Sequence, residues 1–180
     1  MEFILALLSL AGTWVSVLTA ILLLYIRSLH IVYFVVGSVL TAFAAKILKN
    51  AIKQPRPSHS SNVRSKISYG MPSSHSQVIA FFAVYIHLAF SANAIEYSLV
   101  RSILVIFVQL TAFLVAWSRV ELGHHSLPQV LVGSVLGATI ALLWYILWQE
   151  IGSKYEEKFK GDIFVIGFEK AVSLVHPLSY

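Results

Sequence analysis

The sequence contains no cysteine among its 180 residues. This absence excludes disulfide bonds, thiol nucleophiles and thiolate metal sites, so covalent chemistry would have to come from histidine, serine, aspartate or lysine. Charged residues are also scarce, because they make up 12% of the chain against 58% hydrophobic residues. Soluble domains carry about a quarter charged residues. Together with a mean hydropathy of +0.79, this composition predicts an integral membrane protein.

Five uncharged runs are long enough, or nearly so, to cross a bilayer as helices, because lipid offers no partner for an unpaired backbone group. They cover residues 3–26, 28–45, 77–95, 102–117 and 130–149. The first run is longer than the apolar core of a signal peptide, so we expect it to be retained. The predicted fold class is all-α, a polytopic membrane helix bundle of about five transmembrane helices that forms a single domain over residues 1–180. In the polar tail, 150–180, a short apolar stretch at 164–175 is expected to lie at the membrane interface.

The net charge of +5 comes mainly from basic residues in the polar segments between these runs. Basic clusters beside membrane spans more often face lipid phosphate groups than nucleic acid, so no nucleic-acid partner is expected. Five spans would place segments 49–75 and 118–129 on the same side of the membrane. These two segments are the richest in residue types that act in catalysis.

The first motif consists of Lys49 and, after six residues, Arg56 and Pro57. A lysine near the end of a helix and an arginine in the following loop can bind one phosphate together, the first as a point charge and the second as a bidentate fork. A basic pair in such a place is more often a solvated anchor near lipid headgroups. Taken alone, this motif is therefore weak evidence for a phosphate site.

The second motif is Gly-Met-Pro-Ser-Ser-His-Ser at residues 70–76, directly before the third uncharged run. Ser73 or Ser74 can cap the helix that follows, whose backbone amides and positive end then face any nearby anion. His75 would lie beside that anion site. The alternative, favoured for an isolated histidine, is a capped helix with a histidine at the membrane interface.

The third motif ends the fourth uncharged run with Trp-Ser-Arg at residues 117–119 and continues to His125 and Gln129. Ser126 can cap the next helix, and a proline is tolerated in its first turn. Gln129 is then one turn from His125 and can orient its ring. His124 is expected to point in a different direction from His125, and we interpret it as having no catalytic role.

In this order, Lys-x6-Arg-Pro, Pro-Ser-x-His and Ser-Arg-x5-His resemble the three signatures of the type-2 phosphatidic acid phosphatase (PAP2) superfamily, over a catalytic core at residues 49–129. Two positions depart from the general family, which has glycine in place of Ser74 and aspartate in place of Gln129. A glutamine can fix a histidine tautomer but supplies no charge, so a weakened enzyme is one interpretation. Both departures, and the phrase Tyr-Gly-Met-Pro-Ser-Ser-His-Ser-Gln at 69–77, are similar to the dolichyldiphosphatase branch.

The resemblance implies a PAP2/haloperoxidase-like core in which His125 is the nucleophile and His75 is the acid. It also implies that Gln129 orients His125. Phosphoryl oxygens of the substrate would be bound by Lys49, Arg56, Ser73, Ser74 and Arg119. No metal and no other cofactor is implied, because Glu121 is the only acidic residue in these segments and two-metal phosphatases need several.

The dolichyldiphosphatase branch hydrolyses dolichyl diphosphate to dolichyl phosphate and inorganic phosphate. The resemblance therefore implies the same reaction here, through a phosphohistidine, in recycling the lipid carrier of protein N-glycosylation. It implies an endoplasmic reticulum membrane protein with its active site facing the lumen. When the substrate-binding cations are left out of the count, lysine and arginine are more frequent on the opposite side, which agrees with that orientation.

Other functions are compatible with parts of the pattern. A broader lipid phosphatase acting on phosphatidate, sphingoid phosphate or undecaprenyl diphosphate would use the same residues. A catalytically inactive membrane relative would keep the fold, but all five ionic side chains are present, namely Lys49, Arg56, His75, Arg119 and His125. A small channel or transporter would not explain the fixed spacing of the motifs. The sequence leaves the oligomeric state and the isoprenoid length open.

Overall fold

A computed structural model describes residues 29–57, 68–92, 98–152 and 154–155. Within these residues the chain is helical and contains no β-strand. The helices are α3 (Leu29–Ile52), α4 (Ser74–Ala92), α5 (Ser98–Glu121) and α6 (Leu127–Leu147), and α6 continues into a π-helix at Trp148–Gly152. The predicted all-α class is confirmed. The first expected span, 3–26, and the apolar stretch 164–175 lie outside the described residues.

Two of the helices extend farther than their uncharged runs. Helix α3 continues to Ile52 and α5 continues to Glu121, so Lys49 and Arg119 each lie in the last turn of a helix. A cation in the last turn is favourable because it faces the negative end of the helix dipole. A charged residue therefore marked the end of the apolar run without ending the helix.

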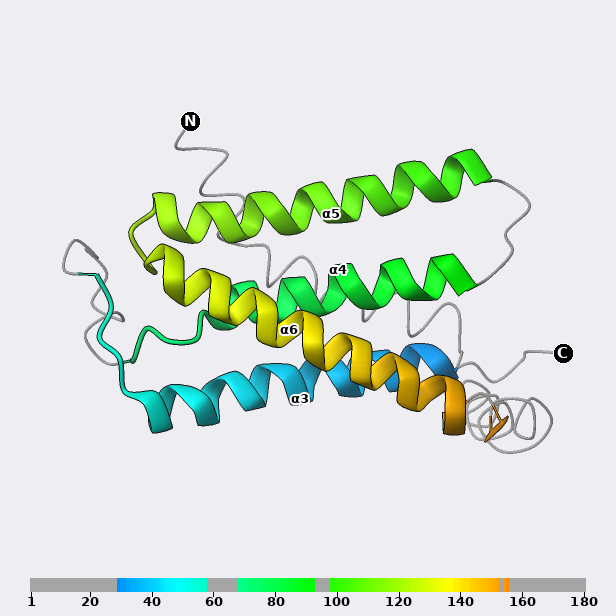
Figure 1. Ribbon diagram of the computed structural model, residues 1–180, viewed down its shortest axis with the longest axis horizontal. Coiled ribbons are helices and arrows are strands. Elements are labelled where there is room, and N and C mark those ends of the chain that lie inside the picture. Colours follow the sequence, from blue (N-terminus) through cyan, green and yellow to red (C-terminus); the bar gives the residue numbers. More distant parts are fainter. Residues whose placement is uncertain (1–28, 58–67, 93–97, 153, 156–180) are drawn as a thin grey trace, which may run out of the picture.

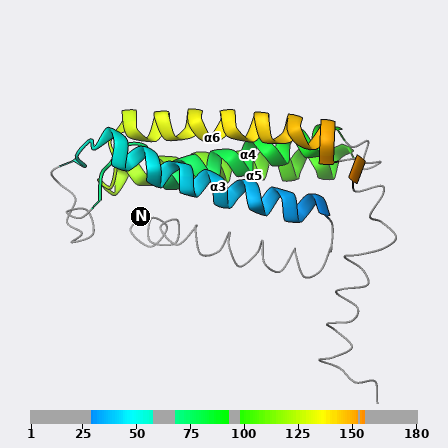
Figure 2. The same ribbon diagram turned by 90° about the horizontal axis from the view of Figure 1, so that it is seen from below.

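Three of the described helical segments are long and apolar enough to cross a membrane: Leu29–Ile52, Arg101–Glu121 and Leu127–Gly152. Helix α4, which corresponds to the expected span 77–95, begins with Ser-His-Ser-Gln and carries His87 within its apolar stretch. It is the central helix. It packs most extensively against α6 and also contacts α5 and α3, and Figure 2 shows it between α6 and α3. The protein is an integral membrane helix bundle.

Small residues on α6 allow α4 to approach closely. A side chain at Gly133 would place its Cβ 2.6 Å from the backbone oxygen of Ser73, and one at Gly137 would overlap the backbone oxygen of Gln77. Glycines four residues apart form a stripe along one helix face, which lets two membrane helices meet backbone to backbone. The start of α4 is thereby held against the start of α6.

An aromatic cluster closes the other end of the bundle. The His30 ring stacks on Trp148 with centroids 4.4 Å apart, and His30 Nε2 lies 2.9 Å from the Tyr85 hydroxyl. Tyr85 in turn packs in the buried core with Phe81 and Tyr145. These contacts join α3, α4 and the end of α6 far from the three motifs, so they stabilise the bundle without occupying the candidate site.

Candidate active site

The three motifs meet at one end of the bundle. Helix α3 ends there, α4 begins there, α5 ends there and α6 begins there, at the left of Figure 1. Two backbone contacts join the motifs directly, because Ser73 N donates to Gln129 O at 3.0 Å and Gly70 N donates to Gln54 O at 2.7 Å. The helix ends in segments 49–75 and 118–129 therefore lie at the same end of the bundle, which agrees with the prediction that both segments are on one side of the membrane.

His125 is 4% exposed and lies just before α6. Its backbone N–H donates to Arg119 O at 3.0 Å, which closes the turn after α5. Gly123, with φ 66, makes that turn possible because a residue with a side chain rarely adopts this conformation. Ser126 is the N-cap of α6, as its position in the sequence indicated. The turn therefore fixes the His125 side chain over the start of the helix.

Gln129 contacts the His125 ring as predicted. Its Oε1 lies 3.3 Å from His125 Nδ1 and also accepts a hydrogen bond of 3.2 Å from Ser126 N–H. We assign the proton to Nδ1, because Gln129 Oε1 can only accept. This tautomer leaves the lone pair of His125 Nε2 available.

The other half of the Gln129 carboxamide holds the first motif. Its Nε2 donates to Gln54 Oε1 at 3.1 Å and to Pro55 O at 2.9 Å. Gly70 packs against the same carboxamide so closely that a Cβ would lie 2.5 Å from Gln129 Nε2. Gln129 is 2% exposed, and all of its polar groups are used. One side chain thus joins His125 to the loop that carries Arg56.

Ser73 caps α4 from a fully buried position. Its Oγ accepts from Ser76 N–H at 3.5 Å and from the Ser76 hydroxyl at 2.9 Å. Because both contacts donate to Ser73 Oγ, its own proton can still be donated to a bound oxygen. Ser74 is the first residue of α4 and His75 the second, and the His75 side chain is exposed.

Three cations surround this end. Arg56 donates to Ser68 O at 3.2 Å, to Ser68 Oγ at 2.7 Å and to His124 O at 3.4 Å, so it spans the first loop and the α5–α6 turn. Arg119 is 4% exposed and donates to Ser118 Oγ from Nε and NH2, at 3.3 and 3.2 Å. Lys49 is half-buried in the last turn of α3.

The charges of Lys49 and Arg56 lower the pKa of both imidazoles. Burial and then the charges of Arg56 and Lys49 lower the pKa of His125 to about 3. Partial burial and then the charges of Arg119 and Lys49 lower the pKa of His75 to about 4, with a smaller effect of Arg56. Both rings are neutral at neutral pH while no anion is bound. Such a concentration of positive charge favours a ligand with several negative charges.

A comparison with known protein families identifies the family of this chain. The PAP2 superfamily model matches residues 29–153. The chain belongs to the PAP2 superfamily. That match covers all three motifs and the four described helices that carry them.

Several curated proteins are similar to this member of the superfamily. Dolichyldiphosphatase 1 of Homo sapiens is 36% identical over 156 residues, which cover 82% of this chain and 65% of that protein. Dolichyldiphosphatase 1 of Dictyostelium discoideum is 36% identical over 126 residues, 69% of this chain and 55% of that one. Lipid phosphate phosphatase gamma of Arabidopsis thaliana is 32% identical over 124 residues, 68% and 55% respectively. The chain therefore spans less than two thirds of the length of these relatives.

A solved structure has the same arrangement of helices. The transmembrane PAP2-type phosphatidylglycerolphosphate phosphatase from Bacillus subtilis superposes with a TM-score of 0.67 at 25% identity, covering 84% of this chain and 76% of that chain. This similarity supports the PAP2-type membrane bundle as the fold. The roles of individual residues stay predictions.

Sequence reasoning missed several residues that shape the site. Gln54 and Ser68 bind Gln129 and Arg56, and no residue type or spacing distinguished them from other polar loop residues. Gly70 was noted only as part of the second motif. The pair Gly133 and Gly137 did carry a signal, because glycines four apart in an apolar run indicate close helix packing. Ser76 could have been found as the residue three positions after an N-cap serine.

The two-sided contact of Gln129 yields a test. We expect Gln129→Glu to lower kcat/KM by about tenfold or more, because it keeps an acceptor for His125 but removes both donors, and an unsatisfied buried polar group costs about 1–3 kcal/mol. Gln129→Asp, which is also shorter, is expected to lose at least as much. Steady-state kinetics of the purified variants would measure this.

The matched control is Gln149→Glu, which makes the same change at an exposed position near the other end of α6. It should retain wild-type kinetics. A gain in rate for Gln129→Asp would contradict the proposed need for the amide donors. It would indicate instead that the glutamine determines substrate specificity.

Proposed function

We propose that the protein is a membrane-embedded lipid diphosphate phosphatase that hydrolyses dolichyl diphosphate to dolichyl phosphate and inorganic phosphate. The observation that carries the proposal is the meeting of two histidines and three cations, all from the three motifs, at one end of a membrane bundle. The similarity to proteins named dolichyldiphosphatase supports the choice of substrate. Two adjacent phosphates also suit a site with this much positive charge.

In the proposed first step His125 Nε2 attacks the terminal phosphorus. A phosphorus–nitrogen bond forms, the bridging phosphorus–oxygen bond breaks, and dolichyl phosphate leaves with a proton from His75. In the second step water attacks the phosphohistidine, His75 takes the proton from water, and phosphate leaves His125. Gln129 would hold the ring in the required tautomer throughout both steps.

Stabilisation of the transferring phosphoryl group would come from the donors already in place. Lys49, Arg56 and Arg119 would neutralise the charge on its oxygens, and the Ser73 hydroxyl and the start of α4 would add hydrogen bonds. Ser74, at the first position of that helix, would contribute its side chain and amide. Because these groups are positioned by helix ends, little reorganisation is needed when substrate arrives. We propose that this chemistry requires no metal.

The decisive experiment is release of inorganic phosphate from dolichyl diphosphate by the purified protein in EDTA, with phosphatidate assayed in parallel. We expect rapid release from dolichyl diphosphate and slow release from phosphatidate. Equal rates on both lipids would instead favour a broader lipid phosphatase. The similarity to lipid phosphate phosphatase gamma supports that alternative. No release from any phosphorylated lipid, with or without divalent cations, would leave only an inactive relative.

The cellular setting is part of the same proposal. An endoplasmic reticulum membrane, with the site facing the lumen, would place the enzyme where dolichyl diphosphate is released in N-glycosylation. The excess of lysine and arginine on the side opposite the motifs supports this orientation. We further propose that the described bundle and the remaining segments form one domain.

A further inference from the structure

A buried hydrogen bond joins α3 to α4 inside the bundle. Gln77, the fourth residue of α4, is fully buried, and its Nε2 donates to the backbone oxygen of Thr41 on α3 at 3.1 Å. The other end of the same carboxamide, Oε1, is buried without a hydrogen-bond partner in the part of the chain that the structure describes. An unpaired buried acceptor costs stability, and a methionine of similar length would avoid that cost. Stability alone therefore does not account for a glutamine at this position.

The acceptor of this bond belongs to a row of residues on α3 that ends at Lys49. The buried residues of α3 are Gly37, Thr41 and Ala45, and Lys49 continues their spacing of four in the last turn. Residues four apart form a row along the surface of a helix. Thr41 precedes Lys49 by about 12 Å along the axis, at about 1.5 Å per residue. A contact that fixes Thr41 against α4 therefore also fixes the direction in which the Lys49 side chain leaves the helix.

The donor of the bond is anchored to the helices that begin at the candidate site. Gln77 follows His75 by two residues, and its backbone N–H donates to Ser73 O at 2.9 Å. Gly137 of α6 packs so closely here that a Cβ on it would overlap the backbone oxygen of Gln77. Gln77 therefore connects the helix that carries Lys49 to both α4 and α6.

Contacts at both ends also hold α3. At the far end, the Tyr33 hydroxyl donates to Trp144 O and Trp144 Nε1 donates to Tyr33 O, each at 3.0 Å. This pair is about 24 Å from Lys49 along the helix, at about 1.5 Å per residue. Beyond the near end, Gln129 holds the loop that follows α3, but a contact in a loop does not fix the rotation of the helix before it. The bond from Gln77 lies between these contacts and acts on the helix itself.

We infer that Gln77 is a positioning residue that acts through Lys49, because it holds α3 in the rotation that directs the Lys49 ammonium at the bound phosphate. This role rests on the proposed function, in which Lys49 binds a phosphoryl oxygen. The charge of a lysine is at the end of a flexible stem, so the position of its backbone limits the sites that it can reach. Because Gln77 is fully buried, it influences the ligand through the position of α3 and not by contact.

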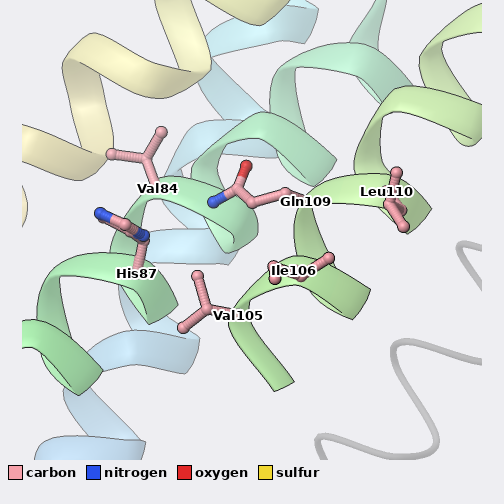
Figure 3. A pocket seen from close by; sticks show the side chains of 6 residues that line it. All are labelled: Val84, His87, Val105, Ile106, Gln109 and Leu110. Atoms are coloured by element: carbon pink, nitrogen blue, oxygen red, sulfur yellow. The ribbon is translucent and has the colours of Figure 1, made fainter. Parts of the chain in front are cut away.

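Gln109 provides a matched control on another helix. Figure 3 shows the Gln109 side chain reaching from α5 toward α4, where its Nε2 donates to Ala83 O at 3.1 Å. This bond has the same donor, the same kind of acceptor and the same length as the bond of Gln77. The cation of α5 is held differently, because the backbone oxygen of Arg119 itself accepts from His125 N–H at 3.0 Å. Removal of the Gln109 amide should therefore leave Arg119 in place.

The test is a double-mutant cycle of ligand binding, measured by calorimetry with the non-hydrolysable probe methylenediphosphonate. Lys49→Met should weaken binding by about tenfold or more, the usual loss for a hydrogen bond to a charged group. Gln77→Met should weaken it by about threefold or more, within the range of coupling between interacting residues. In the Lys49→Met background, Gln77→Met should cause no further loss, because the residue through which it acts is gone. Gln109→Met should bind the probe like the wild-type protein.

Thermal unfolding of the same purified variants separates positioning from a purely structural role. Gln77→Met removes the unpaired acceptor together with the donor, so its unfolding midpoint should stay at or above that of the wild-type protein. An equal loss of affinity with and without Lys49, wild-type affinity in Gln77→Met, an equal loss in Gln109→Met, or no binding by the wild-type protein would each overturn the inference. If the coupling is found while dolichyl diphosphate is not hydrolysed, the positioning role stands and the proposed reaction fails.

Discussion

His125→Ala is expected to abolish turnover of dolichyl diphosphate. Removal of a covalent nucleophile lowers kcat by about a millionfold in well-studied cases, and His125 is the histidine whose ring is oriented by Gln129 and enclosed by protein. The variant should also fail to accumulate a phosphoenzyme when the reaction is quenched rapidly and the protein is analysed for acid-labile, alkali-stable phosphate.

The adjacent His124 supplies a matched control. Its backbone oxygen accepts a hydrogen bond from Arg56, and this acceptor is kept when the side chain is removed. His124→Ala should therefore stay close to wild-type turnover and form phosphoenzyme normally. Wild-type rates for His125→Ala, or phosphoenzyme on another residue, would contradict the proposed mechanism.

His75→Ala is expected to lower kcat by about 10²- to 10⁴-fold, the usual contribution of a general acid or base. KM should change little, because the phosphate is held mainly by the three cations. The measurement is steady-state kinetics on dolichyl diphosphate. A variant that loses affinity and keeps kcat would show that His75 binds substrate without transferring a proton.

The pH behaviour separates these roles further. The pKa of His75 is lowered to about 4 by partial burial and by the charges of Arg119 and Lys49, so the ring is neutral at neutral pH in the free protein. A bound diphosphate or vanadate offsets those positive charges and raises this pKa. Between about pH 4 and neutrality, binding should therefore take up a proton, which calorimetry in buffers of different ionisation enthalpy would detect. His75→Ala should lose that uptake, and an uptake unchanged in the variant would assign the proton to another group.

Much of the fold could be predicted from the sequence, because membrane insertion depends on local hydrophobicity. The uncharged runs 28–45, 77–95, 102–117 and 130–149 all correspond to described helices. The predicted ends of these helices were less accurate. Lys49 and Arg119 lie in the last turns of their helices, and hydropathy alone does not detect that a helix continues through a charged residue. The central position of α4 was also not predicted. An inward-facing helix can keep polar residues that a lipid-facing helix cannot, but an uncharged run in the sequence does not show which way a helix faces.

The same distinction between what the sequence predicts and what only the structure reveals applies to the candidate site. The residues predicted to carry the chemistry lie in three motifs with fixed spacing, so the sequence alone was sufficient to propose them as candidates. The neighbours that position them come from contacts over long distances in sequence, such as Gln54 with Gln129 and Gly70 with the same carboxamide. No local pattern encodes such pairs.

The sequence by itself determined that the protein is a helical membrane protein with PAP2 motifs, because helix formation and insertion follow from hydrophobicity and the motifs are contiguous in the chain. Only the tertiary structure decided that Gln129 serves two motifs at once and that α5 and α6 leave an apolar groove between them over α4. Both depend on how closely α4 packs against α6 and how far α5 lies from α6. Those distances are set by small side chains on several helices acting together.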